Sequence, residues 1–558
     1  MISRDQALTA LQEHPFDVVV VGGGITGAGV ALDAASRGYS VALVERGDFG
    51  QGTSSRSSKM VHGGLRYLQN FDLGLVREAL LERQLLVRLA PHLVYPTPFL
   101  VPALGGERKN RAIGIGLNMY DVMATSRIGR GRSQRNEHRE EADYWSPDRH
   151  RTISGDEAAE LIPALEPMDP SSAYLFYDCQ TDDARLVLTV LGEAERFGAV
   201  IVNGAEVSEV LEDDGRATGV AFTEAELGER IEVHADNVVN ATGVWADQIR
   251  PGELLSEEEI PKIRPSRGSH VTLSTDDIDI GTAACIVPAA GDRTIFALPW
   301  YGRVLVGTTD NDYEGETDHV PPGGDDIDYL LEALNAYFGT DIDRSRLTGA
   351  YAGVRPLISS GDPKKSVDIS RKAELYETSS GMLTITGGKL TTFRRMAAQV
   401  VDRIVERDGR EAECRTDDIP LGMTARPEDL ETSVELPQGA TEQLAFRYGH
   451  AAREVLDLCD ERAELAEPIV PGHPDLMAEV VIAARHEQAR SVADVLLRRT
   501  RLALVAEPGL RDGARVEAVA TALGNELEWS PSRTADEIEA WGRAAEAEGL
   551  DPSRVLAS

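Results

Sequence analysis

Residues 16–45 constrain the fold of this chain more than any other stretch of its sequence. The apolar run 18–21 is typical of a buried parallel strand, the segment 28–37 of a helix, and the segment 40–44 of a second strand. A strand, a helix and a strand in this order predict a βαβ unit, and therefore a parallel sheet with helices packed on it.

Three glycines stand between the first strand and the helix, in the spacing G-x-G-x-x-G. Gly22 permits a tight turn, Gly24 lets the backbone approach a pyrophosphate, and Gly27 lets the helix pack closely on the strand. The helix then begins with unpaired N–H groups and the positive end of its dipole. Glu45, at the end of the second strand, can bind a ribose hydroxyl. The unit is therefore predicted to bind a dinucleotide.

The loop that follows indicates which dinucleotide is bound. Residues 52–58, here called the serine loop, are almost all small, and their hydroxyl and N–H groups can bind a long, extended cofactor. FAD fits this loop because its flavin extends well beyond the pyrophosphate. A nicotinamide-dependent chain usually continues instead with further alternating strands and helices.

At this point the chain resembles a known family, the FAD-dependent glycerol-3-phosphate dehydrogenases of the respiratory type, which pass electrons to quinone. The resemblance covers nearly the whole chain in collinear order. Its motifs are GGGITGAGVALDAASRGYSVALVE, TSSRSSKMVHGGLRYL, YDCQTDDARL, NATGVWAD, RGSH, GTTD, AGVRPL, GGKLTTFR and, near the C-terminus, HEQARSVADVLLRRTR.

The resemblance implies an α/β fold with three parts. These are a discontinuous Rossmann-like FAD-binding domain, an antiparallel-sheet substrate domain like that of glycine and D-amino-acid oxidases, and a C-terminal α-helical domain. The FAD-binding domain is expected at 15–90, 176–262 and 376–407, the substrate domain at 91–175 and 263–375, and the helical domain at 408–558. In the last helix, Thr534 and Glu537 have the spacing of a capping box.

Composition limits the other possibilities. A chain of 558 residues is too long for one core and implies two or three domains. The formal charge of −36 argues against nucleic acid as a partner. The four cysteines are scattered without C-x-x-C spacing, so neither a disulfide framework nor a zinc site is expected. No segment is apolar enough to span a bilayer and the N-terminus lacks a signal-peptide pattern, so a cytoplasmic location is expected.

The resemblance also implies which residues contact FAD. They lie in the glycine turn, in and after the serine loop, and in the later motifs. They are Gly22, Gly24, Ile25, Thr26, Gly27, Glu45, Arg46, Thr53, Ser54, Ser55, Ser58, Lys59, His62, Gly63, Gly64, Leu65, Val207, Ala241, Thr242, Gly243, Trp245, Gly388, Lys389, Leu390, Thr391 and Thr392.

The implied substrate is a small phosphorylated polyol, a dianion that needs guanidinium and ammonium groups in an acidic protein. The candidates are Arg66 with the neighbouring Tyr67, Arg355, Arg371 and Lys389. The alternative for each charged side chain is an ion pair at the surface.

Oxidation of an alcohol also requires a proton acceptor, and histidine titrates near neutrality. His270 in RGSH is the preferred base or hydroxyl-orienting group, and His62 in VHGGLRY is the alternative, although either could be a core histidine. Arg355 would bind the charge that forms on the oxygen. Asp182, Asp183 and Arg185 are interpreted as a helix start with an internal ion pair, and no metal site is expected.

A basic run follows an apolar segment, 114–123, in the first third of the chain. It consists of Arg127, Arg130, Arg132, Arg135 and Arg139. The run could lie on an anionic membrane, with Ile113, Ile115, Leu117 and Met119 inserted beside it, or it could be a solvated loop.

The preferred function is oxidation of sn-glycerol 3-phosphate to dihydroxyacetone phosphate by hydride transfer to FAD N5, with quinone as acceptor and a peripheral position on the inner face of the cell membrane. Three alternatives stay open: a soluble oxidase that uses oxygen, an amine or amino-acid oxidase of the same fold, and a non-catalytic flavoprotein that binds a partner. The oligomeric state is also open, with a homodimer among the options.

Overall fold

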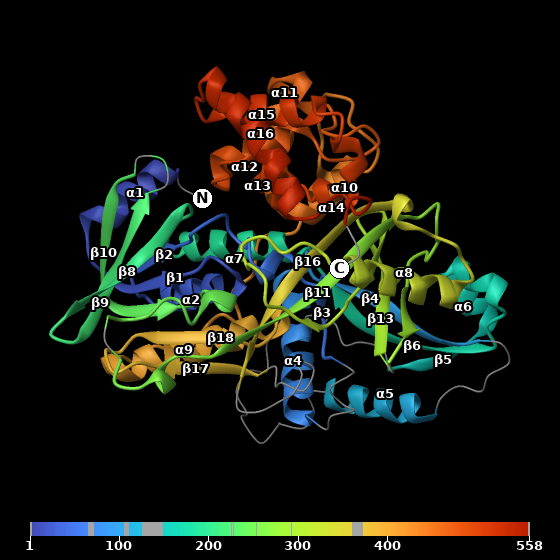
Figure 1. Cartoon of the computed structure of the whole chain (residues 1–558), viewed down its shortest axis with the longest axis horizontal. Coiled ribbons are helices and arrows are strands. Elements are labelled where there is room, and N and C mark those ends of the chain that lie inside the picture. The colour runs from blue at the N-terminus through green and yellow to red at the C-terminus, as the bar shows by residue number, and fades with distance from the viewer. Residues whose placement is uncertain are drawn as a thin grey trace.

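The computed structural model describes residues 3–64, 72–104, 111–124, 149–224, 226, 228–252, 254–291, 293–359 and 372–555. Two β-sheets lie side by side in these residues, and a group of helices from the C-terminal part of the chain covers both (Figure 1).

The first sheet contains the predicted βαβ unit. Its strands run in the order β17-β18-β10-β1-β2-β7, and β1 pairs in parallel with both β10 and β2. The bounds are β1 Phe16–Val21, β2 Val41–Val44, β7 Val200–Val202, β10 Arg230–Asn240, β17 Ala373–Glu377 and β18 Leu383–Gly387. Segments far apart in the sequence therefore form one sheet, as the resemblance implies.

Strand β1 is buried on both faces, which explains its uninterrupted apolar run. Val18 and Val20 pack in a core formed with helices α2 (Ile25–Ser36), α7 (Asp183–Arg196) and α9 (Phe393–Asp408). Val19 and Val21 face the opposite way. Their core includes side chains of α1 (Arg4–Glu13) and of the hairpin β8 (Ala205–Asp213) and β9 (Arg216–Glu224), which continues into β10.

The second sheet is almost entirely antiparallel. Its order is β15-β11-β14-β13-β12-β4-β6-β3, with β16 on β11 and β5 on β6. The bounds are β3 Met60–Val61, β4 Tyr95–Ala103, β5 Arg151–Ser154, β6 Ser172–Gln180, β11 Ile263–Ser274, β12 Ala284–Ala289, β13 Arg293–Trp300, β14 Arg303–Gly307, β15 Asn311–Asp312 and β16 Leu347–Ile358.

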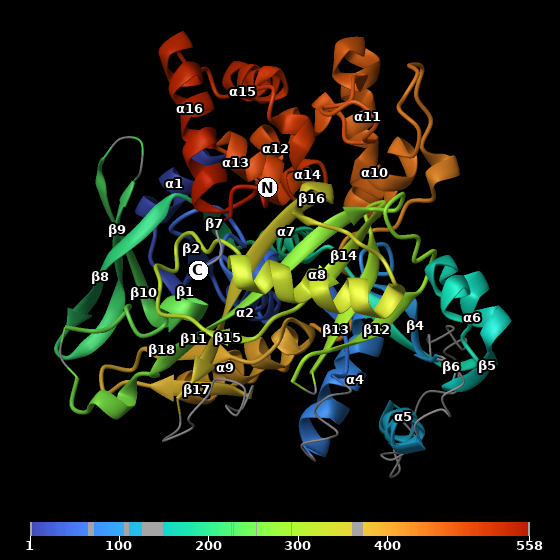
Figure 2. The same ribbon diagram turned by 45° about the vertical axis from the view of Figure 1, so that its right-hand side comes forward.

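Side chains alternate between the two faces of this second sheet. Leu100, Leu175 and Ala297 belong to a core shared with α6 (Gly155–Leu161) and α8 (Gly324–Phe338). Their neighbours Phe99, Phe176 and Phe296 point to the other face. Helices α4 (Leu73–Leu89) and α5 (Arg111–Ala124) lie at the edge of the molecule remote from the C-terminal helices (Figures 1 and 2).

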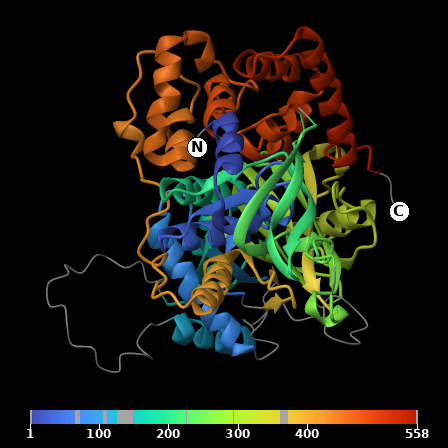
Figure 3. The same ribbon diagram turned by 90° about the vertical axis from the view of Figure 1, so that its left-hand side faces the viewer.

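The C-terminal part is helical, and in side view its helices stand over the rest of the chain (Figure 3). The bounds are α10 Ala440–Tyr448, α11 Ala452–Glu461, α12 Met477–His486, α13 Val492–Asp494, α14 Leu502–Val505, α15 Ala514–Glu526 and α16 Pro531–Ala547. Leu502 and Leu504 share one core with Trp300 and Tyr351 of the second sheet. The three-part α/β fold is thus confirmed, while the residue boundaries of the domains stay a prediction.

The last helix, α16, begins differently from the prediction. The cap of α16 is not the predicted one: Ser530 caps the helix by accepting from Arg533 N, and Thr534 lies within it. Glu537 instead accepts from Val492 N, a contact between helices that spacing alone does not reveal. Within the described residues, no helix is both long and apolar enough to cross a membrane.

Candidate active site

A cavity of about 690 Å³, here called the central cavity, is lined by residues of both sheets. The ends of β1, β2, β10 and β18 and the loops after them contribute one side. The face of the second sheet that carries the phenylalanines contributes the other, with residues from β4, β6, β11, β12 and β13. Strands distant in sequence therefore bring the predicted motifs to one place.

Each of the three glycines of the G-x-G-x-x-G turn has a distinct structural role. Gly22 has φ +110°, and a Cβ there would lie 2.7 Å from the Ala241 oxygen. A Cβ on Gly27 would lie 1.9 Å from the Gly22 oxygen, so Gly27 serves helix packing. Gly24 caps α2 with an ordinary φ of −78° and lines the cavity, where the nearest atom to a built Cβ is Ser54 Oγ at 3.1 Å. Of these three glycines, only Gly24 has no backbone atom within 4 Å of a built Cβ, so its position opens toward a ligand.

Glu45 lies at the predicted end of β2 and lines the cavity. Its carboxylate accepts from Gly23 N at 2.6 Å and from Gly47 N at 2.8 Å, and so holds the glycine turn in place. Beside it the guanidinium of Arg46 lies 4.7 Å from the ring centre of Trp245, and both side chains line the cavity. The contact of Glu45 with a ribose hydroxyl stays a prediction.

Most residues predicted to contact the cofactor line this cavity. They are Gly22, Gly24, Ile25, Thr26, Glu45, Arg46, Thr53, Ser54, Ser58, His62, Gly64, Val207, Ala241, Thr242, Gly243, Trp245, Gly388, Lys389, Leu390 and Thr391.

Five other residues predicted to contact the cofactor are not in the lining itself but contact residues or elements next to it. Gly27 packs α2 on β1, Gly63 N donates to the Tyr120 hydroxyl, and Thr392 Oγ1 donates to the Lys389 carbonyl. The carbonyl of Ser55 accepts from the ammonium of Lys59, which is buried. Leu65, together with the substrate candidates Arg66, Tyr67 and Arg371, lies outside the described residues.

His270 lies on β11 and lines the cavity. Its Nε2 is 2.9 Å from Ser58 Oγ, and its ring stacks on Tyr351 with 4.7 Å between ring centres. Burial, with the nearby charges of Lys59 and Arg355, lowers the pKa of His270 well below its ordinary value of 6.5. The imidazole is therefore neutral at pH 7 and can accept a proton, although it is a weaker base than the sequence argument assumed. His62 also lines the cavity, and its backbone N–H donates to Thr391 Oγ1.

Arg355 lies on β16 and reaches the same cavity. Its Nη1 is 3.4 Å from Asp310 Oδ1 and its Nη2 is 3.2 Å from the Thr309 carbonyl oxygen. Asp310 also accepts from Ser266 Oγ at 2.6 Å, so the carboxylate that orients Arg355 is itself fixed. The side chain of Arg355 is 25% exposed and lines the cavity.

Sequence reasoning missed several lining residues. Arg56 and Arg293 also line the cavity, so with Arg46, Arg355 and Lys389 five arginine and lysine side chains of the described residues line it. The position of Arg56 within the serine loop could have revealed it, whereas Arg293 belongs to no recognised motif. The apolar lining was missed as well. It includes Met60, Phe99, Val101, Ile113, Phe176, Ile286 and Phe296.

The interpretation of the TDDARL motif was partly wrong. Asp182 does begin a helix, because its carboxylate accepts from Ala184 N and Arg185 N at the start of α7. The ion pair, however, is not internal. Arg185 binds Glu487, which lies 302 residues later at the end of α12.

The residues that line the cavity fit FAD. The start of α2 and its open Gly24 suit a pyrophosphate, the serine loop offers hydroxyl groups along the lining, and apolar and basic side chains follow on the second sheet. A long molecule with a charged pyrophosphate and a flat ring system matches these groups of residues.

Comparisons with known proteins agree with this arrangement. Residues 17–394 match the family described as FAD dependent oxidoreductase, and residues 414–534 match the C-terminal domain of alpha-glycerophosphate oxidase. The two matches together cover most of the chain. FAD is therefore the cofactor.

Similarity to individual proteins shows to which FAD-dependent oxidoreductases the chain is related. Glycerol-3-phosphate dehydrogenase 1 of Mycobacterium tuberculosis is 38% identical over 532 residues, which cover 93% of this chain and 96% of that protein. The aerobic glycerol-3-phosphate dehydrogenase of Bacillus subtilis is 34% identical over 89% of each chain. The structure of glycerol-3-phosphate dehydrogenase from Bacillus halodurans, complexed with FAD, superposes with a TM-score of 0.75 at 25% identity, covering 98% of this chain and 97% of that one. The chain thus belongs to the family of FAD-dependent glycerol-3-phosphate dehydrogenases.

Proposed function

We propose that this protein oxidises sn-glycerol 3-phosphate to dihydroxyacetone phosphate in the central cavity and delivers the electrons to a quinone. FAD, when bound, would supply the redox chemistry as the hydride acceptor. The residues of this chain supply binding, orientation and a proton acceptor. The names of the relatives support the substrate, and the lining of the cavity supports the division of roles below.

The phosphate is assigned to the basic side chains of the cavity. A net charge of −36 repels a dianion at long range, so only a local group of cations can hold one. Arg355, Lys389 and Arg293 line the same cavity from three different strands or loops. Charge-assisted hydrogen bonds from such groups are roughly twice as strong as neutral ones, and a guanidinium can also offer two of them at once.

The proton of the substrate hydroxyl is assigned to His270. The bond to Ser58 and the stacked ring of Tyr351 fix the imidazole, and its lowered pKa keeps it neutral at pH 7. As hydride leaves the carbon that bears the hydroxyl, the proton passes to the imidazole and the carbonyl forms. Arg355 lies near enough to lower the pKa of His270, and its positive charge would stabilise negative charge on the oxygen. His62, also in the lining, is the second candidate for the base.

The apolar part of the cavity is the observation that favours quinone over oxygen. Phe99, Phe176 and Phe296 form an aromatic wall, with ring centres 5.4 Å and 6.1 Å apart for the pairs that Phe99 makes. Ile113 joins this lining from α5. A lipophilic acceptor needs an apolar route to the flavin site, whereas oxygen does not.

The outer face of α5 supports contact with a membrane. Ile115, Met119 and Val122, spaced on one side of the helix, are 64%, 37% and 55% exposed. The expected insertion of Leu117 was wrong, because this side chain is fully buried, and Ile113 packs against the core. The basic run from Arg127 to Arg139 lies outside the described residues, and its contact with lipid stays a prediction.

Anaerobic titration tests the proposed reaction. Glycerol 3-phosphate should bleach the flavin absorbance without air, and a soluble quinone should restore the colour many times faster than oxygen does. Reoxidation by oxygen with stoichiometric peroxide would support the oxidase alternative instead. Bleaching by glycine or D-amino acids alone would support an amino-acid oxidase. A flavin that no such compound reduces would indicate a non-catalytic role.

Replacing Ile115, Met119 and Val122 together by serine should release the protein from liposomes. Three partly exposed apolar side chains contribute on the order of 3 kcal/mol when they enter lipid, so partitioning should fall about 100-fold. Activity with a soluble dye should not change, because these three side chains are not among the residues that line the central cavity. Sedimentation with liposomes measures the effect.

Leu255→Ser with Met423→Ser is the matched control, since these side chains are 87% and 69% exposed elsewhere on the surface. Equal sedimentation of the triple variant and the parent protein would remove α5 from the membrane contact. An equal loss of sedimentation with liposomes in the control variant would also remove α5 from the membrane contact.

A further inference from the structure

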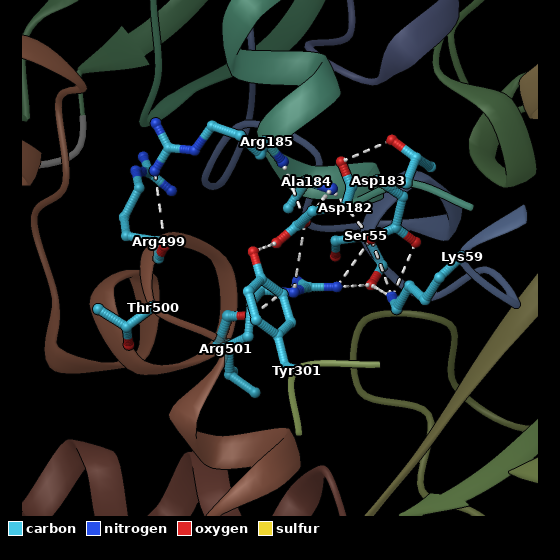
Figure 4. A network of polar contacts seen from close by, with 12 residues as sticks. Ser55, Lys59, Asp182, Asp183, Ala184, Arg185, Tyr301, Arg499, Thr500 and Arg501 are labelled. Carbon is cyan, nitrogen blue, oxygen red and sulfur yellow. Dashed lines mark hydrogen bonds and ion pairs between the residues drawn. The ribbon is translucent and has the colours of Figure 1, made fainter. Parts of the chain in front are cut away.

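A buried polar network joins the C-terminal helices to the serine loop (Figure 4). Arg501, at the start of α14, is buried and has a left-handed φ of +65°. Its Nη2 donates to the carbonyl oxygen of Ser55 at 2.9 Å and to Asp183 Oδ1 at 2.7 Å. The preceding segment, Val495–Arg499, is a π-helical turn, a distortion that occurs frequently at functional sites.

The same acceptors bind a second cation. Lys59 Nζ donates to the Ser55 carbonyl at 2.6 Å and to both oxygens of Asp183, at 2.8 and 2.9 Å. Asp183 in turn accepts from the backbone N–H and the hydroxyl of Ser57, at 3.0 and 2.7 Å. One buried carboxylate and one carbonyl therefore tie the serine loop to Lys59 and to Arg501.

The opposite side of the serine loop faces the site. Ser57 and Ser58 line the central cavity, and Ser58 Oγ contacts His270. The Tyr351 hydroxyl donates to the Ser57 carbonyl at 2.9 Å, and the same tyrosine ring stacks on His270. A displacement of the loop would therefore move both the hydroxyl groups in the lining and the partner of the imidazole.

A second contact ties the same loop to the C-terminal helices. Glu548, at the end of α16, accepts from Arg56 Nη2 at 2.6 Å. Arg56 is one of the five arginine and lysine residues of the described chain that line the cavity. Two separate side chains of the C-terminal part thus reach the loop, one at Ser55 and one at Arg56.

We propose that Arg501 is a positioning residue of the active site, which acts through Asp183 and Lys59 to hold the serine loop against the flavin and His270. The C-terminal helices then complete the site instead of only covering it. This inference rests on the proposed placement of FAD and substrate in the central cavity.

Arg501→Gln tests the proposal, because glutamine keeps a polar side chain but removes the charge and the forked donor. The FAD dissociation constant should rise about 10- to 100-fold, the change expected from the loss of one hydrogen bond to a charged group. The visible circular dichroism of the bound flavin should change, and glycerol 3-phosphate should reduce the flavin more slowly. Arg501→Lys should restore part of the affinity, since lysine keeps the charge.

Arg185→Gln is the matched control for lost stability alone. Arg185 is also a buried arginine that bridges to the C-terminal helices, through Glu487, but it does not contact the serine loop. It should lower the melting temperature while leaving the FAD dissociation constant within about twofold. Equal losses in both variants would overturn the proposal, as would Arg501→Gln with the parental affinity, spectrum and reduction rate.

Ser57→Ala covers the case in which Arg501→Gln does not fold. It removes one hydroxyl from Asp183 and leaves both cations in place, so it should weaken FAD binding in the same direction by a smaller factor. Parental FAD affinity in Ser57→Ala would then contradict the proposal. Gly24→Val distinguishes failure of the proposed cofactor placement from failure of the role of Arg501. If Gly24→Val retains FAD, the placement of the cofactor is wrong. If it loses FAD while Arg501→Gln does not, only the role of Arg501 fails.

Discussion

Gly24→Val is expected to give a folded but colourless protein. The backbone of Gly24 has φ −78°, which valine adopts without strain, and the nearest atom to its Cβ would be Ser54 Oγ at 3.1 Å. The remaining methyl groups would enter the cavity where the pyrophosphate is expected. Two or more charge-assisted hydrogen bonds would be lost together, each about 1.5–3 kcal/mol, so FAD affinity should fall by on the order of 1000-fold.

The ratio of flavin absorbance to protein absorbance after purification measures this effect. Gly192→Val is the control, because Gly192 lies in α7 and a Cβ there meets nothing within 4 Å. It should retain FAD. A Gly24→Val protein with one FAD per chain would show that the nucleotide does not bind at this turn.

Arg355→Ala should produce the second large effect, on the substrate and not on the cofactor. A buried charge-assisted partner of a dianion is worth about 2–5 kcal/mol, which corresponds to a loss of roughly 30- to 5000-fold in the second-order rate of flavin reduction. Both the substrate concentration needed for half-saturation and the limiting rate should change, because the guanidinium is assigned to the phosphate and to the forming oxygen charge. Anaerobic stopped-flow measurements separate the two.

Arg264→Ala is the matched control for Arg355→Ala. Arg264 lies on β11, which pairs with the strand of Arg355, but its partner is Asp312 at 2.9 Å and both side chains are more than 30% exposed. Exposed pairs of this kind contribute about 0–1 kcal/mol, so the control should reduce its flavin at the parental rate. Parental kinetics in Arg355→Ala would remove Arg355 from the site.

The sequence by itself determined the features that depend on neighbouring residues. The apolar run of β1 and the glycine turn are local patterns, and each follows from the geometry of one strand or one turn. His270 and Arg355 were recognised for the same reason, since each lies in a short and distinctive motif. The family, the cofactor and the fold class were predictable from the family resemblance that the collinear motifs carry.

Only the tertiary structure decided the partners of buried charges and the direction of particular side chains. Arg185 was assigned to a neighbouring aspartate, yet it binds Glu487, and Arg501 reaches Ser55 across 446 residues. Leu117 was expected at a membrane and is instead buried, while Ile115 on the same helix is exposed. The physical reason is that spacing specifies which residues share a face of one element. A buried ion pair depends on which elements pack together. Because a buried charge without a partner costs a large desolvation free energy, the pairing that the packing permits is strongly favoured.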